Sequence, residues 1–289
     1  MPEEKIRYES EVAKLPPEIL WHYTSSSAFL SMATNASLRF TDYRFLNDSS
    51  EFLFGVEVFT REMHKLQKVE TDKKREILLE RIIKEMERSR AWLRAYVFCM
   101  SPEDDSLTHW TSYSNKQEPI AIGFQSSSFT NFPWIGYRAE LVSVIYDKDV
   151  QNFLAQNEIK SFLQLPQCLE YLRFDSTDIE TIDFEVFILR CCDICVRFKN
   201  SKFSDEKEWR LVTRFGLEHG PFSELKFYSN GSGIIPCLDM VAQYKLLPIE
   251  QIMIGPRRPD KMQETSHMEF LLRHEYYNVK INASTLPIR

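Results

Sequence analysis

Short apolar segments of strand length alternate with helical segments along the whole chain of 289 residues. The strand-like segments are rich in aromatic and β-branched residues and are bounded by Pro, Gly, Asn or Ser. The helical segments instead repeat apolar residues every three or four positions among charged ones. No internal repeat or low-complexity linker divides the chain. This order predicts an α+β fold with mixed or antiparallel central sheets.

Two stretches of helical periodicity interrupt the strands as insertions. Residues 1–18 form a polar leader ending in Pro16-Pro17, a pair that opposes helix formation. A single domain is expected over residues 19–289, with helical insertions at about 60–94 and 149–198. The second insertion includes a long apolar segment, Ile182 to Phe198, for which helix is predicted although the pattern alone leaves its type ambiguous.

The composition narrows the class of protein. The formal net charge is -6 and 43% of the residues are hydrophobic, which predicts a substantial core and no global basic field for nucleic acid. The start of the chain lacks a signal peptide and no apolar run is long enough to span a bilayer, so a cytoplasmic location is expected. Six cysteines are too sparse for a disulfide framework. Cys191, Cys192 and Cys195 are expected to be small apolar core residues.

Ionisable residues occur in two widely separated strand candidates. His22 lies in the segment Ile19–Thr24, before a helix that Ser25, Ser26 or Ser27 is expected to cap. Glu206, Glu208 and Arg210 alternate toward the end of the chain, which predicts that they share one face of a strand. If the two strands are neighbours, His22 and the glutamates meet in one cleft. A structural histidine and a cross-strand salt-bridge ladder explain the same patterns.

Other polar positions favour structural roles. Asp48 and Glu51 have the spacing of a helix-capping box. Trp110 and Tyr113 lie three residues apart on a predicted short helix, where sealing the core is the simpler role. Weaker anion-binding candidates are Arg39, Arg44 and the turn Gly255-Pro256-Arg257-Arg258.

Four blocks in this order resemble the bacterial domain-of-unknown-function family numbered 2971. The blocks are His22-Tyr23-Thr24, Phe45 to Glu51, Trp110 to Tyr113 followed by Ile120 to Phe124, and Glu206 to Arg210. Two positions depart from the family pattern, because Ser112 stands where a His is usual and Pro119 where a Gly is usual. Neither departure affects the first and last blocks.

The first and last blocks are also similar to the dinucleotide site of ADP-ribosyltransferases. This resemblance implies that His22 holds a ribose, that Tyr113 or Tyr43 stacks on nicotinamide, and that Glu208 engages the nicotinamide ribose. Glu206 then orients or activates the acceptor. The implied catalytic residues are Glu208 and Glu206. The implied dinucleotide-binding residues are His22, Tyr23, Thr24, Tyr43, Tyr113 and Arg210.

The leading hypothesis is therefore an ADP-ribosyltransferase-like enzyme, or an NAD glycohydrolase, that consumes NAD as a substrate and needs no metal. The acceptor is a protein, a nucleic acid, a small molecule or water, and the biological role is that of a bacterial toxin or phage-defence effector. The alternative is a non-catalytic module that binds a nucleotide or a protein, with the charged segment 62–94 as an interface. A metal-dependent hydrolase fits poorly, because no metal-ligand spacing supports it.

Overall fold

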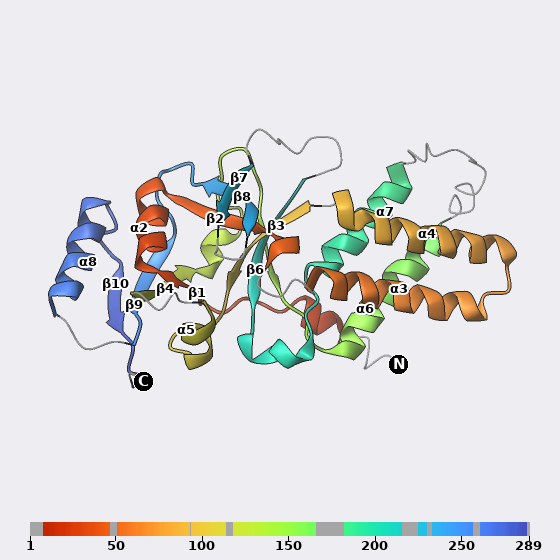
Figure 1. The fold of residues 1–289 in the computed structure, drawn as a ribbon, viewed down its shortest axis with the longest axis horizontal. Coiled ribbons are helices and arrows are strands. Elements are labelled where there is room, and N and C mark those ends of the chain that lie inside the picture. Colours follow the sequence, from red (N-terminus) through yellow and green to blue (C-terminus); the bar gives the residue numbers. More distant parts are fainter. Residues whose placement is uncertain are drawn as a thin grey trace.

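Two β-sheets and a layer of helices make up the described part of the chain in this computed structural model (Figure 1). The sheets lie at the left and centre of Figure 1, and the helical layer extends to the right. The residues that the structure describes are 8–46, 51–92, 94–113, 118–165, 182–215, 225–229, 233–256 and 261–287.

The first sheet joins strands from both ends of the chain in the order β1-β4-β9-β10. These strands are β1 (Ile19–Ser25), β4 (Pro119–Gln125), β9 (Ile249–Ile254) and β10 (Lys280–Ala283). Neighbouring strands are antiparallel except β9 and β10, which are parallel. The sheet is therefore mixed.

The second sheet is antiparallel throughout, with the order β5-β6-β3-β2-β8-β7. Its strands are β2 (Ser37–Asp42), β3 (Arg94–Met100), β5 (Glu140–Ser143), β6 (Trp209–Phe215), β7 (Lys226–Ser229) and β8 (Ile234–Val241). Together with the helices, the two sheets confirm the predicted α+β class with mixed and antiparallel sheets.

The two sheets share one aromatic and aliphatic core. Leu20 and Phe124 from the first sheet and Phe40 and Phe98 from the second are all buried in it. The sheets also touch directly, since β1 and the end of β3 exchange two backbone hydrogen bonds between Trp21 and Ser101. Because side chains alternate along a strand, the residues between these core positions face away from the shared core.

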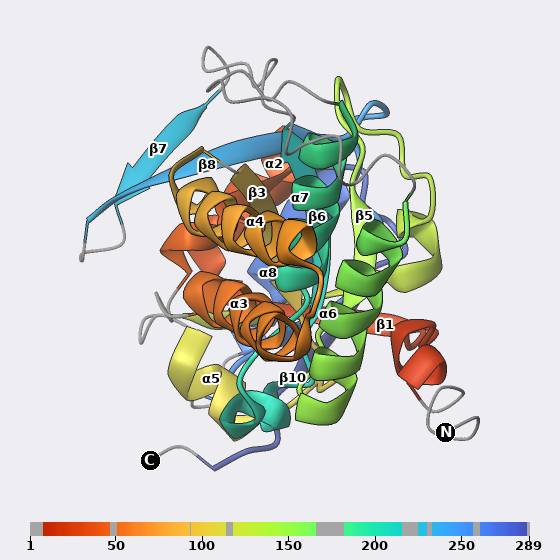
Figure 2. The ribbon, with the colours of Figure 1, turned by 90° about the vertical axis from the view of Figure 1, so that its right-hand side faces the viewer.

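A layer of four helices packs on the outer face of the second sheet, opposite the shared core (Figures 1 and 2). These helices are α3 (Glu51–Val69), α4 (Lys73–Trp92), α6 (Lys148–Leu163) and α7 (Ile182–Cys195). Val97 and Val212 of the sheet are buried against them. The two insertions, far apart in the sequence, thus build one layer, which covers only part of that face.

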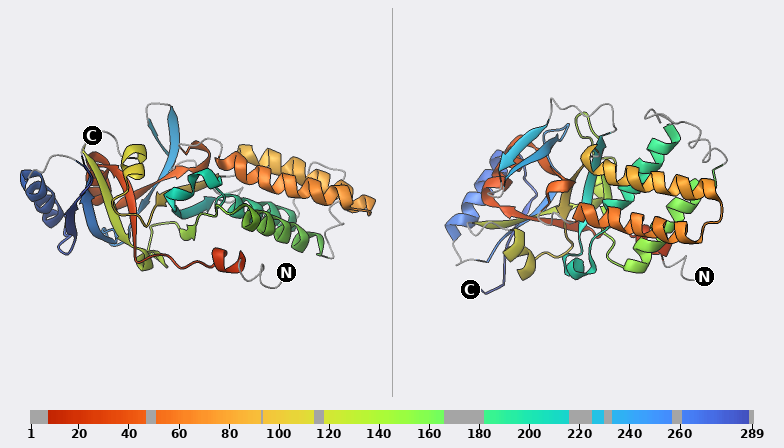
Figure 3. Two further views of the ribbon diagram at one scale, coloured as in Figure 1. Left: turned by 90° about the horizontal axis from the view of Figure 1, so that it is seen from below. Right: turned by 45° about the vertical axis from the view of Figure 1, so that its right-hand side comes forward.

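The long apolar segment of the second insertion is helical over α7, and its cysteines are core residues as predicted. Cys191, Cys192 and Cys195 are buried free thiols, and burial raises the pKa values of Cys191 and Cys195. The leader contacts the same layer, because the ring of Tyr8 lies 4.7 Å from that of Phe153. Figure 3 shows this N-terminal segment running beside the helices.

Smaller elements complete the fold. They are α2 (Ser26–Asn35), α5 (Leu107–Tyr113), α8 (Lys261–Arg273) and the 3-10 turns η1 (Tyr43–Phe45), η2 (Ser126–Phe129) and η4 (Ser201–Glu206). Ser25 caps α2 as predicted, since its hydroxyl accepts a hydrogen bond from the backbone of Ala28. Within the described residues, no helix combines the length and apolar character needed to cross a bilayer.

Candidate functional site

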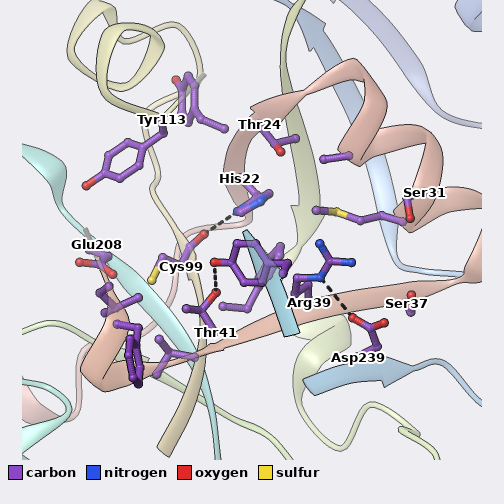
Figure 4. A pocket seen from close by; sticks show the side chains of 18 of the residues that line it. His22, Thr24, Ser31, Ser37, Arg39, Thr41, Cys99, Tyr113, Glu208 and Asp239 are labelled. Carbon is purple, nitrogen blue, oxygen red and sulfur yellow. Dashed lines mark hydrogen bonds and ion pairs between the residues drawn. The ribbon is translucent and has the colours of Figure 1, made fainter. Parts of the chain in front are cut away.

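A cleft of about 1280 Å³ opens on the part of the outer face that the helical layer leaves uncovered (Figure 4). Its lining residues come from strands β1, β2, β3, β7 and β8, from helices α2 and α5, and from the turns η1 and η4. Small-molecule sites usually measure roughly 300–1,000 Å³. The cleft therefore has room for an elongated ligand.

Five charged side chains form a buried cluster at the end of the cleft next to the helices. The buried cluster consists of Glu51, Lys199, Glu206, Glu208 and Arg210. The ammonium nitrogen of Lys199 lies 2.9 Å from Glu51, 2.5 Å from Glu206 and 2.8 Å from Glu208. Lys199 thus joins three carboxylates that come from two separate parts of the chain, the start of α3 and the segment before β6.

Arg210 joins two of the same carboxylates from the other side. Its Nε and Nη2 donate to the two oxygens of Glu208 at 2.8 and 2.9 Å, and Nη2 also contacts Glu51 at 2.5 Å. With three carboxylates and two cations, the buried cluster has one negative charge in excess.

Electrostatics keep Glu208 and Lys199 ionised. Burial raises the pKa of Glu208, but Arg210 and Lys199 outweigh it and lower the pKa to about 2. Burial lowers the pKa of Lys199, but Glu208 and Glu51 more than reverse this, so its pKa is raised. Both side chains are therefore charged at neutral pH.

Close helix packing brings the parts of the buried cluster together. Gly55 lies one turn after Glu51 in α3, and a Cβ atom there would lie 2.7 Å from Cys195 Cβ. Only a glycine lets the start of α3 approach the end of α7 this closely. Lys199 comes shortly after the end of α7 at Cys195, so the same contact brings Glu51 close to Lys199. The predicted cap residue Asp48 lies outside the described residues.

Two residues expected to bind a ligand lie behind the cleft, which corrects their assignment. Arg210 is 0% exposed, and its guanidinium stacks on the ring of Tyr43 at 5.2 Å. The Tyr43 hydroxyl faces backbone carbonyls, including those of Glu51 and Cys195 at 3.3 Å. Neither side chain lines the cleft. Their partners are the buried cluster and the start of α3, which makes them positioning residues.

The two glutamates of the last block occupy different backbone settings. Glu208 and Arg210 share a face next to β6, as alternation predicts. Glu206 instead ends the 3-10 turn η4, and Lys207 adopts a left-handed conformation with φ 47°. The prediction that all three lie on one strand face is therefore wrong for Glu206. Both glutamates still line the cleft, and the Glu206 side chain is the more exposed, at 13% against 7%.

Tyr113 binds the carboxylate oxygen of Glu206 that Lys199 does not contact. Its hydroxyl donates to Glu206 Oε1 at 2.7 Å, and burial is the main reason that its pKa is raised. Tyr113 is the last residue of α5 and lines the cleft. Trp110, on the same helix, is buried and donates to Asp105 at 2.8 Å. Trp110 therefore anchors α5, whereas Tyr113 reaches the cleft.

His22 lies between the two ends of the cleft (Figure 4). Its Nδ1 lies 2.8 Å from the carbonyl oxygen of Cys99, and its ring stacks on Phe98 at 4.1 Å. Burial lowers its pKa to about 4. The ring is therefore neutral at pH 7, with Nδ1 as donor and Nε2 as acceptor. Among the described residues, Nε2 has no hydrogen-bond partner.

The neighbours of His22 alternate between two faces of β1. Thr24 lines the cleft on the same face as His22. The Tyr23 hydroxyl points the other way, donating to the Glu103 carbonyl at 2.7 Å and accepting from the Ser106 amide at 3.1 Å. Tyr23 contributes to the cleft wall, but its hydroxyl is occupied by the loop before α5. Its expected role in dinucleotide binding stays a prediction.

The opposite end of the cleft carries a smaller charged group, called here the arginine end. It consists of Arg39, Thr41, Lys226, Tyr228 and Asp239. Arg39 and Asp239 are register partners on β2 and β8, 3.4 Å apart at Nε and Oδ1. Lys226 contacts the other oxygen of Asp239 at 2.9 Å. Arg44, in contrast, pairs with the buried Asp42 and does not line the cleft.

Two further sequence expectations concern the arginines after β9 and a metal site. Arg257 and Arg258 lie outside the described residues. Among the residues that are described, no group of three or more His, Cys, Asp or Glu has the arrangement of a metal site. The predicted metal-free chemistry stays a prediction.

Lys199 and Glu51 are the main site residues that sequence reasoning missed. Lys199 follows an apolar helix, and Glu51 has the spacing of a capping residue. The one available signal for Lys199 was a lysine immediately after a buried run, where a charged residue requires a partner.

A profile of the family described as "Protein of unknown function (DUF2971)" matches residues 109–211. This match confirms the family resemblance expected from the sequence blocks. The matched segment includes Tyr113, Lys199, Glu206 and Glu208, whereas His22 precedes it. No curated protein and no solved structure matches the chain.

Proposed function

We propose that this cleft binds NAD and cleaves the bond between nicotinamide and ribose, as an ADP-ribosyltransferase or NAD glycohydrolase does. One observation carries the proposal: His22 and Glu208 lie on either side of the same residue, Cys99. The Nδ1 atom of His22 lies 2.8 Å from the Cys99 carbonyl oxygen, and the charge of Glu208 adds to burial in raising the pKa of the Cys99 thiol. A neutral imidazole and an anionic cluster thus share one cleft, as the resemblance requires.

The chemistry fits an anionic end of the cleft. When the glycosidic bond breaks, its electron pair leaves with nicotinamide, which becomes neutral, and positive charge develops on the ribose. A nucleophile then forms a bond to the same carbon and releases a proton. The excess negative charge of the buried cluster stabilises this transition state more than the ground state.

The environments of the two glutamates favour an exchange of their expected roles. Both oxygens of Glu208 are engaged by Arg210, and one of them also by Lys199. We therefore assign Glu206 to the nicotinamide-side ribose and Glu208 to positioning Lys199. Tyr113, which fixes Glu206 and lines the cleft, offers its ring to nicotinamide. His22 offers Nε2 to a ribose hydroxyl.

The wider role follows from the same resemblance. With this activity we expect a cytoplasmic toxin or phage-defence effector whose acceptor is a protein, a nucleic acid or water. A protein partner at segment 62–94 belongs to the same proposal. Many charges there already pair within the helices, as Lys84 does with Glu80 at 2.9 Å and Arg88 with Glu85 at 2.8 Å. A solvated face accounts for those pairs.

A non-catalytic binding module is the second candidate. The observation that favours it is the ion pairing of Glu208, which a purely structural cluster also requires. In that case the cleft binds a nucleotide without cleaving it.

Nicotinamide release and NAD-dependent thermal stabilisation, measured on the same preparations, test the proposal. The Glu206→Gln variant keeps an acceptor for Tyr113 but removes the charge. We expect it to release nicotinamide about a hundredfold more slowly than the wild type while binding NAD nearly as well. NAD at a hundredfold excess over its dissociation constant stabilises by about 2.7 kcal/mol.

The matched control is Glu103→Gln, because Glu103 pairs with Lys207 next to Glu206 in sequence but does not line the cleft. This control is expected to keep wild-type turnover. Stabilisation by NAD without nicotinamide release in the wild type would establish the binding module instead. If NAD neither stabilises the wild type nor releases nicotinamide in its presence, NAD is rejected as the ligand.

A further inference from the structure

The guanidinium of Arg39 is held in one orientation at the arginine end. Asp239 accepts from its Nε on the neighbouring strand, at 3.4 Å. The ring of Tyr228 lies 5.2 Å from its central carbon. The Tyr228 ring is itself tied to β2, because its hydroxyl lies 3.2 Å from Thr41 Oγ1. These contacts leave the two terminal nitrogens of Arg39 without a hydrogen-bond partner among the described residues.

The arginine end also has a positive charge in excess. Arg39 and Lys226 share the single carboxylate of Asp239, which is the least exposed of the three side chains. Arg39 and Lys226 are about half and two-thirds exposed, so both cations are accessible from the cleft. A pinned guanidinium with free terminal nitrogens matches the two oxygens of a phosphate group.

We propose that the arginine end binds the pyrophosphate of the dinucleotide, with Arg39 as the main contact and Lys226 as the second. The inference rests on the proposed function, because it assigns the second half of the same ligand. Figure 4 shows Arg39 and Asp239 at one side of the cleft, Glu208 and Tyr113 at the other, and His22 between them. The excess charges of the two ends are opposite. NAD has the matching polarity, with a cationic nicotinamide ring and an anionic pyrophosphate.

Alternation along β2 explains why these residues face the cleft. Leu38 and Phe40 are buried in the shared core, so Arg39 and Thr41 face the opposite side. A purely structural salt bridge between Arg39 and Asp239 would also require Arg39 to lie on this face. That simpler role does not explain why the arginine stacks on an aromatic ring inside a cleft.

Calorimetric titration with inorganic pyrophosphate at low ionic strength tests the inference without any need for turnover. We expect Arg39→Gln to weaken pyrophosphate binding at least tenfold. Lys226→Gln should weaken it less, because the Lys226 ammonium is a point charge and does not form the paired hydrogen bonds of a guanidinium. The matched control is Arg190→Gln. Arg190 also pairs an exposed guanidinium with a largely buried carboxylate, Glu158, but in the helical layer away from the cleft.

Two outcomes overturn the inference. The first is that Arg39→Gln shows no specific loss of pyrophosphate affinity. This is the case if the variant binds pyrophosphate as tightly as the wild type, or if the Arg190→Gln control loses as much affinity as Arg39→Gln does. The other is pyrophosphate that binds through Arg39 but does not compete with NAD, which assigns the subsite to a different ligand. If the wild type binds pyrophosphate through Arg39 but releases no nicotinamide from NAD, the proposed function fails while the anion subsite stands.

Discussion

The two ends of the cleft use charge in opposite ways. In the buried cluster, five side chains pair almost entirely with one another, and Arg210 is 0% exposed. At the arginine end, three charged side chains pair loosely across three strands, and Arg39 is nearly half exposed. Buried charges require complete pairing, whereas exposed charges do not.

This difference separates residues that hold the fold from residues that meet a ligand. Arg210 has no surface in the cleft, so its charge serves Glu51 and Glu208. Among the residues that the structure describes, none binds the terminal nitrogens of Arg39, so its charge is available to an anion. Glu206 lies between these extremes, because it belongs to the buried cluster and also lines the cleft.

Replacing the arginine at each end sharpens this contrast and should give the largest effect on stability. Arg210→Met leaves Glu51 and Glu208 without one of their buried partners, which costs about 3–5 kcal/mol. Arg39→Met removes a half-exposed pair and costs under about 1 kcal/mol. Denaturant unfolding of the two variants measures both values. Equal losses would remove the distinction between the two ends.

The glycine contact between α3 and α7 supports only the buried cluster. A Cβ at residue 55 meets the Cβ and backbone of Cys195 within 2.7–2.9 Å, so Gly55→Ala forces the helices apart. We expect a loss of about 2 kcal/mol in unfolding free energy, after part of the overpacking is offset by the helix propensity of Ala. At Gly233 an added Cβ meets nothing within 4 Å, so Gly233→Ala is the control. A neutral Gly55→Ala would show that this contact does not position Glu51.

Each end also contains a tyrosine hydroxyl, which allows a matched pair of smaller changes. Tyr113→Phe removes a bond to the charged Glu206, and we expect a loss of about 1.5 kcal/mol. Tyr228→Phe removes a neutral bond to Thr41, and about 0.5 kcal/mol is expected. Thermal unfolding of both variants gives the ranking. The reverse order would mean that Glu206 does not depend on Tyr113.

Acid should affect His22 before it affects the buried cluster. The pKa of His22 is lowered to about 4, so the unfolded chain binds this proton first and stability falls between pH 6.5 and 4. The Glu208 pKa is about 2, so its contribution is lost only below pH 4.5.

The difference in stability between the wild type and His22→Gln isolates the histidine. Because the ring is partly exposed, we expect this difference to shrink by under about 1 kcal/mol as the pH falls from 6.5 to 4.5. The pKa of His109 is also lowered by burial, but His109 is present in both proteins and cancels. A difference that is constant over this range would mean that His22 is not held neutral.

Local patterns were enough to predict much of the fold. The alternation that places His22 and Thr24 on one face of β1 and Tyr23 on the other follows from residue order alone. The helix cap at Ser25 follows in the same way. The helical character of α7 follows from its length and periodicity, which made helix the better interpretation. These features depend on neighbours in sequence, so one chain suffices to find them.

The charged contacts could not be predicted in the same way. Arg39 and Asp239 are 200 residues apart, and their pairing depends on the register between β2 and β8. Glu51 meets Lys199 only because α3 approaches α7 at Gly55. Strand β10, near the end of the chain, was missed because it is short and mostly exposed. For Glu206, the side chain of Asn200 caps the turn η4, a signal that was present in the sequence.

The kinetics of nicotinamide release in the wild type, Glu206→Gln and Arg39→Gln test the central claim most directly. If the two ends hold two parts of one dinucleotide, Glu206→Gln lowers kcat about a hundredfold with little change in KM. Arg39→Gln instead raises KM about tenfold with little change in kcat. Loss of kcat in both variants, or no change in either, would contradict the division of the cleft into a reacting end and an anion-binding end.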